Sequence, residues 1–340
     1  MIFFSIGLFV QDLEPAKKIS LILSMFILAS IAIIPCCYIQ SVKDIKNISN
    51  GILIGIFISI ILALISDTPL TTGASEGLFL NYGFNGGMEH RNYFAYTLLA
   101  SYFSIYTVKE RSRKDNLLLI LNLVLLISTN SRSAYVILLL FVAISYSNKI
   151  KQIDLSRNIL DMIFIITLIL LGVLMFRLLI HYSETFYFRT KGLINYLDTY
   201  SRDIYHLVFG NAEMAFHNER LSYDENIRSV IGWDGSTELV ILNILIKNGL
   251  LGFIGYFIIY QNYFKRLSML KDRYFHTHIF AILVTFLISA FVESFLANIN
   301  YTYTVCNYLI LCNIFLHTIT RKEMGRENNS ILPSTISHNT

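Results

Sequence analysis

Charged residues are scarce in this chain. Aspartate, glutamate, lysine and arginine make up 15% of the 340 residues, whereas they make up about a quarter of a typical soluble domain. Apolar residues make up 54%, and the charges cluster between long apolar runs. This pattern indicates helices that span a membrane.

Several chemical signatures are absent as well. The chain has no basic blocks interleaved with aromatics, so we expect no nucleic-acid partner. It has no GxxxxGK[ST] phosphate loop, no HExxH metal helix and no Asp-x-Asp pair. The four cysteines lie in apolar segments without paired zinc-ligand spacing: Cys36, Cys37, Cys306 and Cys312. We therefore expect no metal and no cofactor, and a reaction driven by an already activated substrate.

Apolar stretches bounded by charge predict an all-α fold, a polytopic transmembrane bundle of about nine or ten helices. We expect spans near residues 20–38, 50–66, 92–108, 116–129, 133–147, 160–181, 238–260, 276–296 and 301–319. The run 2–10 is too short to cross about 30 Å of hydrocarbon. The integral membrane domain would then cover 1–319 and include one large outer loop at 182–237, followed by a polar tail at 320–340.

Lysine and arginine counts in the connecting segments predict the orientation. With the C-terminal tail in the cytoplasm, the inner segments 39–50, 109–115, 148–158, 261–274 and 320–340 hold 16 Lys/Arg in 65 residues. The outer segments 11–19, 67–91, 129–132, 182–237 and 297–300 hold 9 in 98 residues. The excess of positive charge on the inner side favours a multi-pass protein with a cytoplasmic C-terminus.

Some cations nevertheless lie at or near the outer boundary of the predicted membrane region: Arg91, Arg132, Arg177 and Arg189. A cation at bilayer depth costs a few kcal/mol, so a partner is expected. Each arginine could reach lipid headgroups or pair with Glu89 or Glu184. Together they could bind a diphosphate, because guanidinium groups match phosphate oxygens in geometry and charge.

The predicted outer loop is rich in aromatic residues, among them Tyr196, Tyr200, Tyr205 and the sole tryptophan, Trp233. Aromatic faces mixed with Asp, Glu, Asn and His suit a sugar-binding surface. An interfacial aromatic belt explains the same composition, so both interpretations stay open.

Three stretches resemble the O-antigen polymerase and ligase family (Wzy and WaaL type). Residues 131–135, Ser-Arg-Ser-Ala-Tyr, resemble the family's Ser-Arg-Gly/Ser-Ala step into an apolar helix. Arg189 resembles the arginine that opens the large periplasmic loop, and 247–252, Lys-Asn-Gly-Leu-Leu-Gly, resembles the helix ending in Gly-Leu-Leu-Gly. Residues 86–95 match an earlier Asn-containing helix start more weakly. The resemblance covers roughly residues 80 to 260.

The resemblance implies a helical membrane bundle of the bacterial inner membrane that transfers glycans from undecaprenyl diphosphate at its periplasmic face without a metal. Arg132 and Arg189, helped by Arg91 and Arg177, would hold the donor diphosphate. Glu238, with Asp234 as rival, would orient or deprotonate the acceptor hydroxyl. Glu238 could equally be a helix N-terminal acid that interacts with the helix dipole.

One departure from the family pattern separates two activities. Family ligases have a His-Asn pair about eleven residues before the glycine that corresponds to Gly249, and this chain has Glu238 there with no histidine nearby. We therefore expect a polymerase of lipid-linked O-antigen or capsule repeats, whose partners are the undecaprenyl-diphosphate-linked oligosaccharide, the lipid bilayer, a chain-length regulator and a flippase. The alternatives are a ligase, a lipid-linked oligosaccharide flippase or transporter, and a non-catalytic scaffold.

Overall fold

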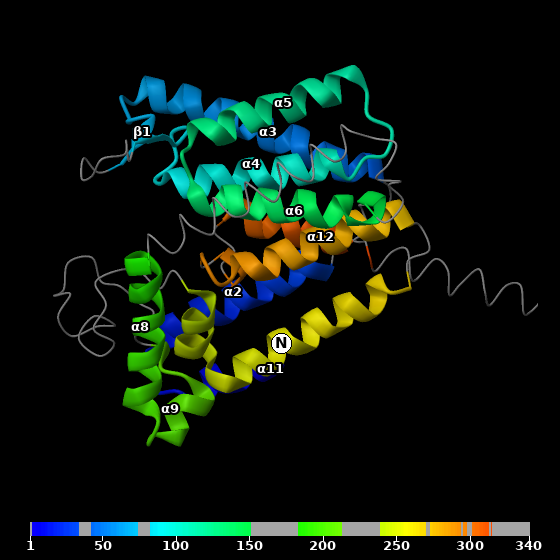
Figure 1. Cartoon of the computed structure of the whole chain (residues 1–340). Helices are drawn as coiled ribbons and strands as arrows, with labels where there is room; N and C mark the ends of the chain where they lie inside the picture. Colours follow the sequence, from blue (N-terminus) through cyan, green and yellow to red (C-terminus); the bar gives the residue numbers. More distant parts are fainter. Residues whose placement is uncertain are drawn as a thin grey trace, which may run out of the picture.

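The structure is a computed structural model, and it describes residues 2–33, 42–73, 82–150, 183–212, 239–269, 273–293, 295–297, 301–312 and 314. This part of the chain is mostly helical, which confirms the all-α class (Figure 1). The helices are α1 Ile2–Val10, α2 Pro15–Ile33, α3 Val42–Ile65, α4 Arg91–Tyr106, α5 Arg113–Ser128, α6 Arg132–Ile150, α8 Ser183–Tyr200, α9 Ile204–Phe209, α11 Val240–Leu267 and α12 Arg273–Ser289. A 3₁₀ turn, η3 Phe295–Ala297, precedes a further helix, Thr302–Cys312.

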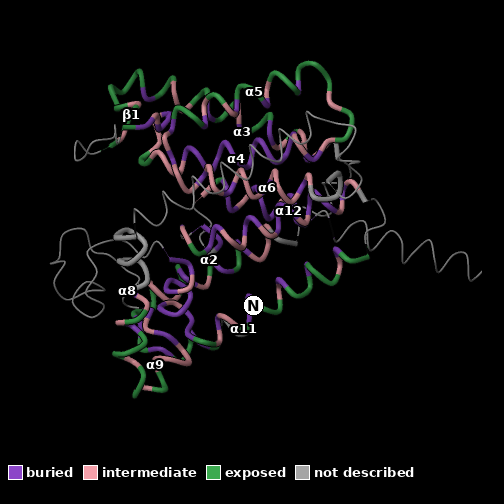
Figure 2. Tube along the Cα trace, viewed as in Figure 1, coloured by how far each residue is buried: buried purple, intermediate pink, exposed green. Residues whose placement is uncertain are grey.

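The largest group of helices is built around α4. Helix α4 packs against α3, α5 and α6, and α6 packs against α12 (Figure 1). Every side chain of α4 from Phe94 to Ile105 is buried, so this helix is surrounded by protein along nearly its whole length (Figure 2). Because a helix that is apolar on all sides needs neighbours on all sides, α4 forms the centre of the core.

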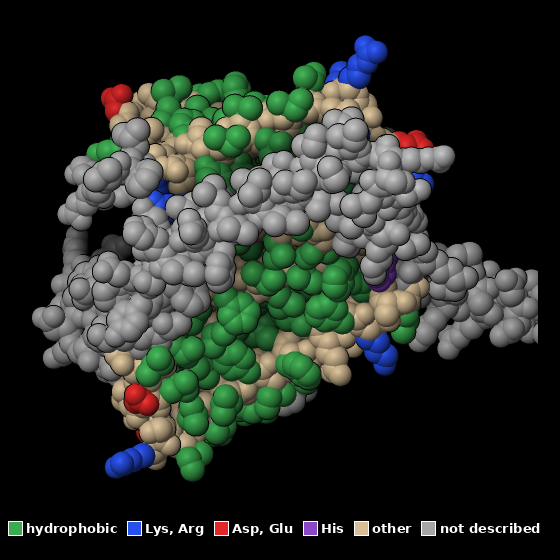
Figure 3. All heavy atoms as spheres, in the orientation of Figure 1, with side chains coloured by type: hydrophobic (Ala, Val, Ile, Leu, Met, Phe, Trp, Pro, Cys, Tyr) green, Lys and Arg blue, Asp and Glu red, His purple; other side chains and the backbone are tan. Residues whose placement is uncertain are grey.

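Among the described residues, two helices are long and apolar enough to cross a membrane, Asp44–Ile65 in α3 and all of α11. Shorter apolar helices cover Arg132–Tyr146, Tyr274–Ser289 and Thr302–Cys312. Much of α3 is exposed, with Phe57 at 64% and Ile65 at 75%, so it is not a core helix. Hydrophobic side chains also gather on the outer faces of α5 and α11 (Figure 3). Exposed apolar faces of this extent mark a surface that contacts protein or lipid.

Helices α4, α5, α6 and α12 start one to three residues before the predicted spans, and polar residues cap α4 and α5. Helix α5 was expected from residue 116 and begins at Arg113. The Ser112 hydroxyl accepts from the Asp115 amide at 3.3 Å and the Asp115 carboxylate accepts from the Ser112 amide at 2.8 Å, which forms a capping box. The Asp115 carboxylate also binds Lys46 of α3 at 2.5 Å, which ties two neighbouring helices together. The predicted span 160–181 lies outside the described residues.

The helices around α4 form a bundle whose two ends carry different parts of the chain. At one end, Lys46 meets Asp115, and the Tyr274 hydroxyl donates to the Tyr106 carbonyl oxygen at 3.3 Å. At the other end lie β1 (Thr71–Thr72), β2 (Gly83–Phe84) and the starts of α4 and α6. The two strands pair antiparallel, Thr71 with Phe84 and Thr72 with Gly83. The described residues of 39–50, 109–115 and 261–274 thus lie at one end of this helix group, and those of 67–91 and 129–132 at the other.

The predicted outer loop contains two helices, α8 and α9, so its first part is not an irregular loop. Asp203 caps α9, because its carboxylate accepts from the His206 amide at 3.3 Å. Tyr196 of α8 is fully buried, and its hydroxyl donates to the Leu245 carbonyl oxygen at 3.3 Å. Tyr196 is therefore a packing residue, which favours the packing interpretation over a sugar-binding surface at this position.

Helix α11 is kinked at Gly249, whose φ of 59° and ψ of −158° are not helical. A Cβ atom at Gly249 would lie 2.3 Å from the Val208 carbonyl oxygen. A Cβ atom at Gly210, φ 85°, would lie 2.7 Å from the Ile246 carbonyl oxygen. Glycine at both positions lets the end of α9 pack directly against the α11 backbone.

Gln11, which follows α1, completes this contact. Its Nε2 donates to the carbonyl oxygens of Phe209 at 2.5 Å and Lys247 at 3.1 Å, and its Oε1 accepts from the Ala212 amide at 2.7 Å. One buried side chain thus satisfies three backbone groups at the kink. The start of α11 is anchored separately, since the Val240 amide donates to the Ala290 carbonyl oxygen at 3.2 Å.

Candidate functional site

The first site element is the start of α4, which carries Arg91. His90 caps this helix, because its Nδ1 accepts from the Asn92 amide at 3.1 Å. The Arg91 amide donates to the Thr72 hydroxyl at 3.2 Å, which joins the helix start to the strand pair. A Cβ at Gly83 would lie 2.9 Å from the Arg91 Cδ atom, so the absence of a side chain there makes room for the arginine stem.

The second site element is the start of α6, which carries Arg132. The preceding turn places Asn130 at φ 51°, a left-handed conformation that asparagine tolerates better than most residues. The Ser131 amide donates to the Thr129 hydroxyl at 3.2 Å, and the Ser131 hydroxyl donates to Asn92 Oδ1 at 2.9 Å. The starts of α4 and α6 are therefore held side by side.

Arg91 and Arg132 are each the first residue of a helix, and they lie close enough for their charges to interact. Burial lowers the pKa of Arg91, and the positive charge of Arg132 lowers it further. Helix N-termini carry a partial positive charge of their own, although the Arg91 and Asn92 amides of α4 already donate to Thr72 and His90. The chain thus concentrates positive potential at one place, and an anion is the ligand that such a place stabilises.

Glu293 lies next to this arginine pair. Its Oε1 accepts from Asn92 Nδ2 at 2.8 Å and from the Ser133 hydroxyl at 3.4 Å. These two donors are the residues that directly follow Arg91 and Arg132. Glu293 is only 5% exposed and is positioned by the turn that ends α12.

A cavity of about 310 Å³ lies beside Tyr93, the residue after Asn92. Its lining is mainly polar and comprises Met88, Glu89, Tyr93, Thr97, Phe295, Tyr301, Thr302 and Tyr303. The Tyr301 hydroxyl donates to the Tyr93 hydroxyl at 3.2 Å, and the two ring centroids are 4.7 Å apart. The size is at the lower end of the range for small-molecule sites, about 300–1,000 Å³. We call it the polar cavity.

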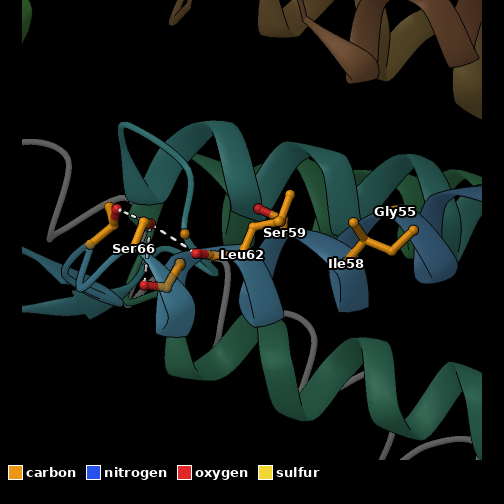
Figure 4. Close-up of a pocket in the computed structure, with 8 residues that line it drawn as sticks. Gly55, Ile58, Ser59, Leu62 and Ser66 are labelled. Atoms are coloured by element: carbon orange, nitrogen blue, oxygen red, sulfur yellow. Dashed lines mark hydrogen bonds between the residues drawn. The ribbon is translucent and has the colours of Figure 1, made fainter.

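Two further cavities run along α3 and have a mainly apolar lining. One, of about 390 Å³, includes Gly51 and Gly55 and shares Met88, Thr97 and Thr302 with the polar cavity. The other, of about 330 Å³, also reaches Gly55 and continues past Ser59 to Ser66 (Figure 4). Figure 4 also shows the Ser66 hydroxyl bonded to the Leu62 carbonyl oxygen. The polar cavity therefore adjoins an apolar groove along a helix that is exposed on its other faces.

No family model, curated protein or solved structure matches this chain. The functional interpretation therefore depends on the residues and their geometry.

The six predicted site residues divide into three groups. The structure brings Arg91 and Arg132 together. The backbone of Arg189 belongs to α8, which lies at the same end of the molecule as the starts of α4 and α6 (Figure 1). Arg177, Asp234 and Glu238 lie outside the described residues, so their roles stay predictions.

Sequence reasoning missed Glu293. This carboxylate falls within the predicted span 276–296, and the rule that drew attention to the arginines, a charge inside an apolar run, applies to it equally. The hydrogen bonds that join Asn92 to Ser131 and Glu293 had no comparable sequence signal, because they connect residues up to 201 positions apart. Within the described residues, no group of three or more His, Cys, Asp or Glu could hold a metal ion.

Proposed function

We propose that this chain is a polytopic membrane polymerase that joins oligosaccharide repeats carried on a lipid diphosphate. The observation that carries the proposal is the pair Arg91 and Arg132 at two adjacent helix N-termini. A diphosphate bound there accepts hydrogen bonds from the two guanidinium groups and is stabilised by the positive ends of the two helix dipoles. The same groups stabilise the negative charge that grows on the diphosphate as its bond to the sugar breaks.

The apolar surroundings support a lipid-linked donor. The arginine pair lies at one end of a bundle in which α3, α5 and α11 expose apolar side chains. A bilayer would cover these surfaces and place the diphosphate at headgroup depth. The predicted orientation assigns this end to the periplasmic face of the bacterial inner membrane, with a cytoplasmic C-terminus. The position of α8 favours Arg189 as a further contact to the same diphosphate.

The test compares Arg132→Ala with a matched control, Arg113→Ala. Arg113 is also the first residue of a helix, but it starts α5 at the opposite end of the bundle and is exposed. In a deletion strain that carries each variant, Arg132→Ala should give single repeats where wild type gives long polymer. Arg113→Ala should restore the normal chain-length distribution, and both variants should accumulate to the wild-type level.

The deletion strain also separates the rival activities. Single repeats attached to the surface indicate a polymerase, complete loss of surface glycan indicates a flippase, and free unattached polymer indicates a ligase. Normal chain length with Arg132→Ala would refute the assigned role of the arginine pair.

A further inference from the structure

Glu293 is connected to both arginine-bearing helices. Its Oε1 accepts from the residue after Arg91 and from the residue after Arg132, so the carboxylate lies between the starts of α4 and α6. Asn92 in turn accepts from Ser131 at 2.9 Å. These contacts hold the carboxylate next to the two residues that follow Arg91 and Arg132.

Glu293 also adjoins the polar cavity. Phe295, two residues further along the chain, and Tyr93, next to Asn92, both line that cavity. Their rings are in contact, with centroids 6.1 Å apart. Glu293 is thus joined to Asn92 on one side and followed along the chain by a residue of the cavity wall, although the carboxylate itself is not part of the lining.

The lining of the polar cavity suits an uncharged polyhydroxy ligand. The rings of Tyr93, Tyr301 and Phe295 provide apolar faces, and the hydroxyls of Thr97 and Thr302 provide hydrogen-bond partners. Glu89 in the lining and Glu293 behind it give this side negative charge. A phosphate group would be repelled there, whereas sugar hydroxyls can donate to carboxylates.

We propose that the polar cavity binds the acceptor sugar and that Glu293 is the catalytic base that takes the proton from its reacting hydroxyl. This inference rests on the proposed function. The acceptor oxygen forms a bond to the anomeric carbon of the donor sugar, and its proton passes to the Glu293 carboxylate. The bond between that carbon and the diphosphate oxygen breaks, and its electron pair leaves with the lipid diphosphate beside Arg91 and Arg132. Attack from the cavity side, opposite the leaving group, inverts the anomeric carbon.

A purely structural role for Glu293 makes a different prediction from a catalytic one. The amide oxygen of Glu293→Gln still accepts from Asn92 and Ser133, so this variant keeps the connection between the helices but cannot take the proton. Asn92→Ala has the opposite effect, because it removes the bonds of Asn92 to Glu293 and Ser131 and leaves the carboxylate. A catalytic base predicts the larger loss for Glu293→Gln, and a structural tie predicts a loss at least as large for Asn92→Ala.

The experiment uses the purified full-length protein with lipid-linked repeats extracted from the deletion strain. Glu293→Gln should lower kcat for polymerisation by about 10²–10⁴-fold with little change in KM, as loss of a general base does. Glu293→Asp, which keeps a carboxylate at a longer distance, should recover part of kcat. Glu110→Gln, an exposed carboxylate at the far end of the bundle, should behave as wild type. Inorganic diphosphate should raise the melting temperature of wild type and Glu293→Gln but not of Arg132→Ala.

The outcomes distinguish failure of this inference from failure of the proposed function. Wild-type kcat for Glu293→Gln together with inactive Arg132→Ala would overturn the base assignment alone. An Asn92→Ala loss as large as that of Glu293→Gln would also overturn it. Normal polymer from both Glu293→Gln and Arg132→Ala would refute the polymerase site itself. If Glu293→Gln fails to accumulate, a wild-type kcat for Glu293→Asp would count against the proposal, because a shortened base cannot keep its full rate.

Discussion

Replacing Gly249 by alanine should strongly destabilise the fold, whereas the same replacement at Gly51 should not. The backbone at Gly249, φ 59° and ψ −158°, is one that residues with a Cβ rarely adopt, at a cost of about 1–3 kcal/mol. The added methyl would lie 2.3 Å from the Val208 carbonyl oxygen and 2.6 Å from the Gly210 nitrogen. Forcing these backbones apart adds a further cost of about 1–3 kcal/mol. The expected loss is thus about 2–6 kcal/mol.

Gly51 is the matched control, because it lies inside α3 with nothing within 4 Å of an added Cβ. Alanine there should stabilise the helix by about 0.5–1 kcal/mol. The assay is thermal unfolding in detergent with a thiol-reactive dye, since the free thiols of Cys306 and Cys312 are buried in the folded protein. Equal unfolding midpoints for the two variants would refute the close backbone contact between α9 and α11.

Two further predictions concern the ties between helices. Gln11→Ala should cost about 2–5 kcal/mol in the same assay, because it leaves buried backbone groups of Phe209, Lys247 and Ala212 without their partner, and a wild-type midpoint would contradict this. Burial raises the pKa of Asp115, but its bonds to Lys46 and Ser112 outweigh burial and hold the pKa below its usual range. The carboxylate therefore stabilises the fold above about pH 4, and this stabilisation is lost as the pH falls through the lowered pKa. Asp115→Asn should lower the free energy of unfolding at neutral pH by about 1.5–3 kcal/mol, and with it the unfolding midpoint. The stability of this variant should also no longer show the loss at low pH that Asp115 causes in the wild type.

Much of the helical layout could be predicted from apolar runs bounded by charge. Helices α4, α5 and α6 begin within three residues of the expected positions. The differences come from capping side chains such as Ser112 and His90, which extend a helix into polar sequence that hydropathy assigns to a connection. Helices α8 and α9 were missed because their apolar residues are mixed with charges, and their stability comes from packing on α11.

The candidate site was only partly predictable. A charge beside an apolar run drew attention to Arg91 and Arg132, and the topology then brings them to one end of the bundle. The connection of Glu293 to Asn92 and Ser133 depends on the way α12 packs against α6, which no local pattern encodes.

The residues that flank 213–238 on each side are bonded to or packed against the rest of the molecule. Ala212 is held through its amide by Gln11, and Leu239 is buried just before an amide that binds the end of α12. A stretch joined at two immobile points can change in length and composition without shifting the helices that carry it. We therefore expect substitutions and insertions between these two points to be tolerated best, and substitutions at Gln11 and Leu239 to be tolerated least.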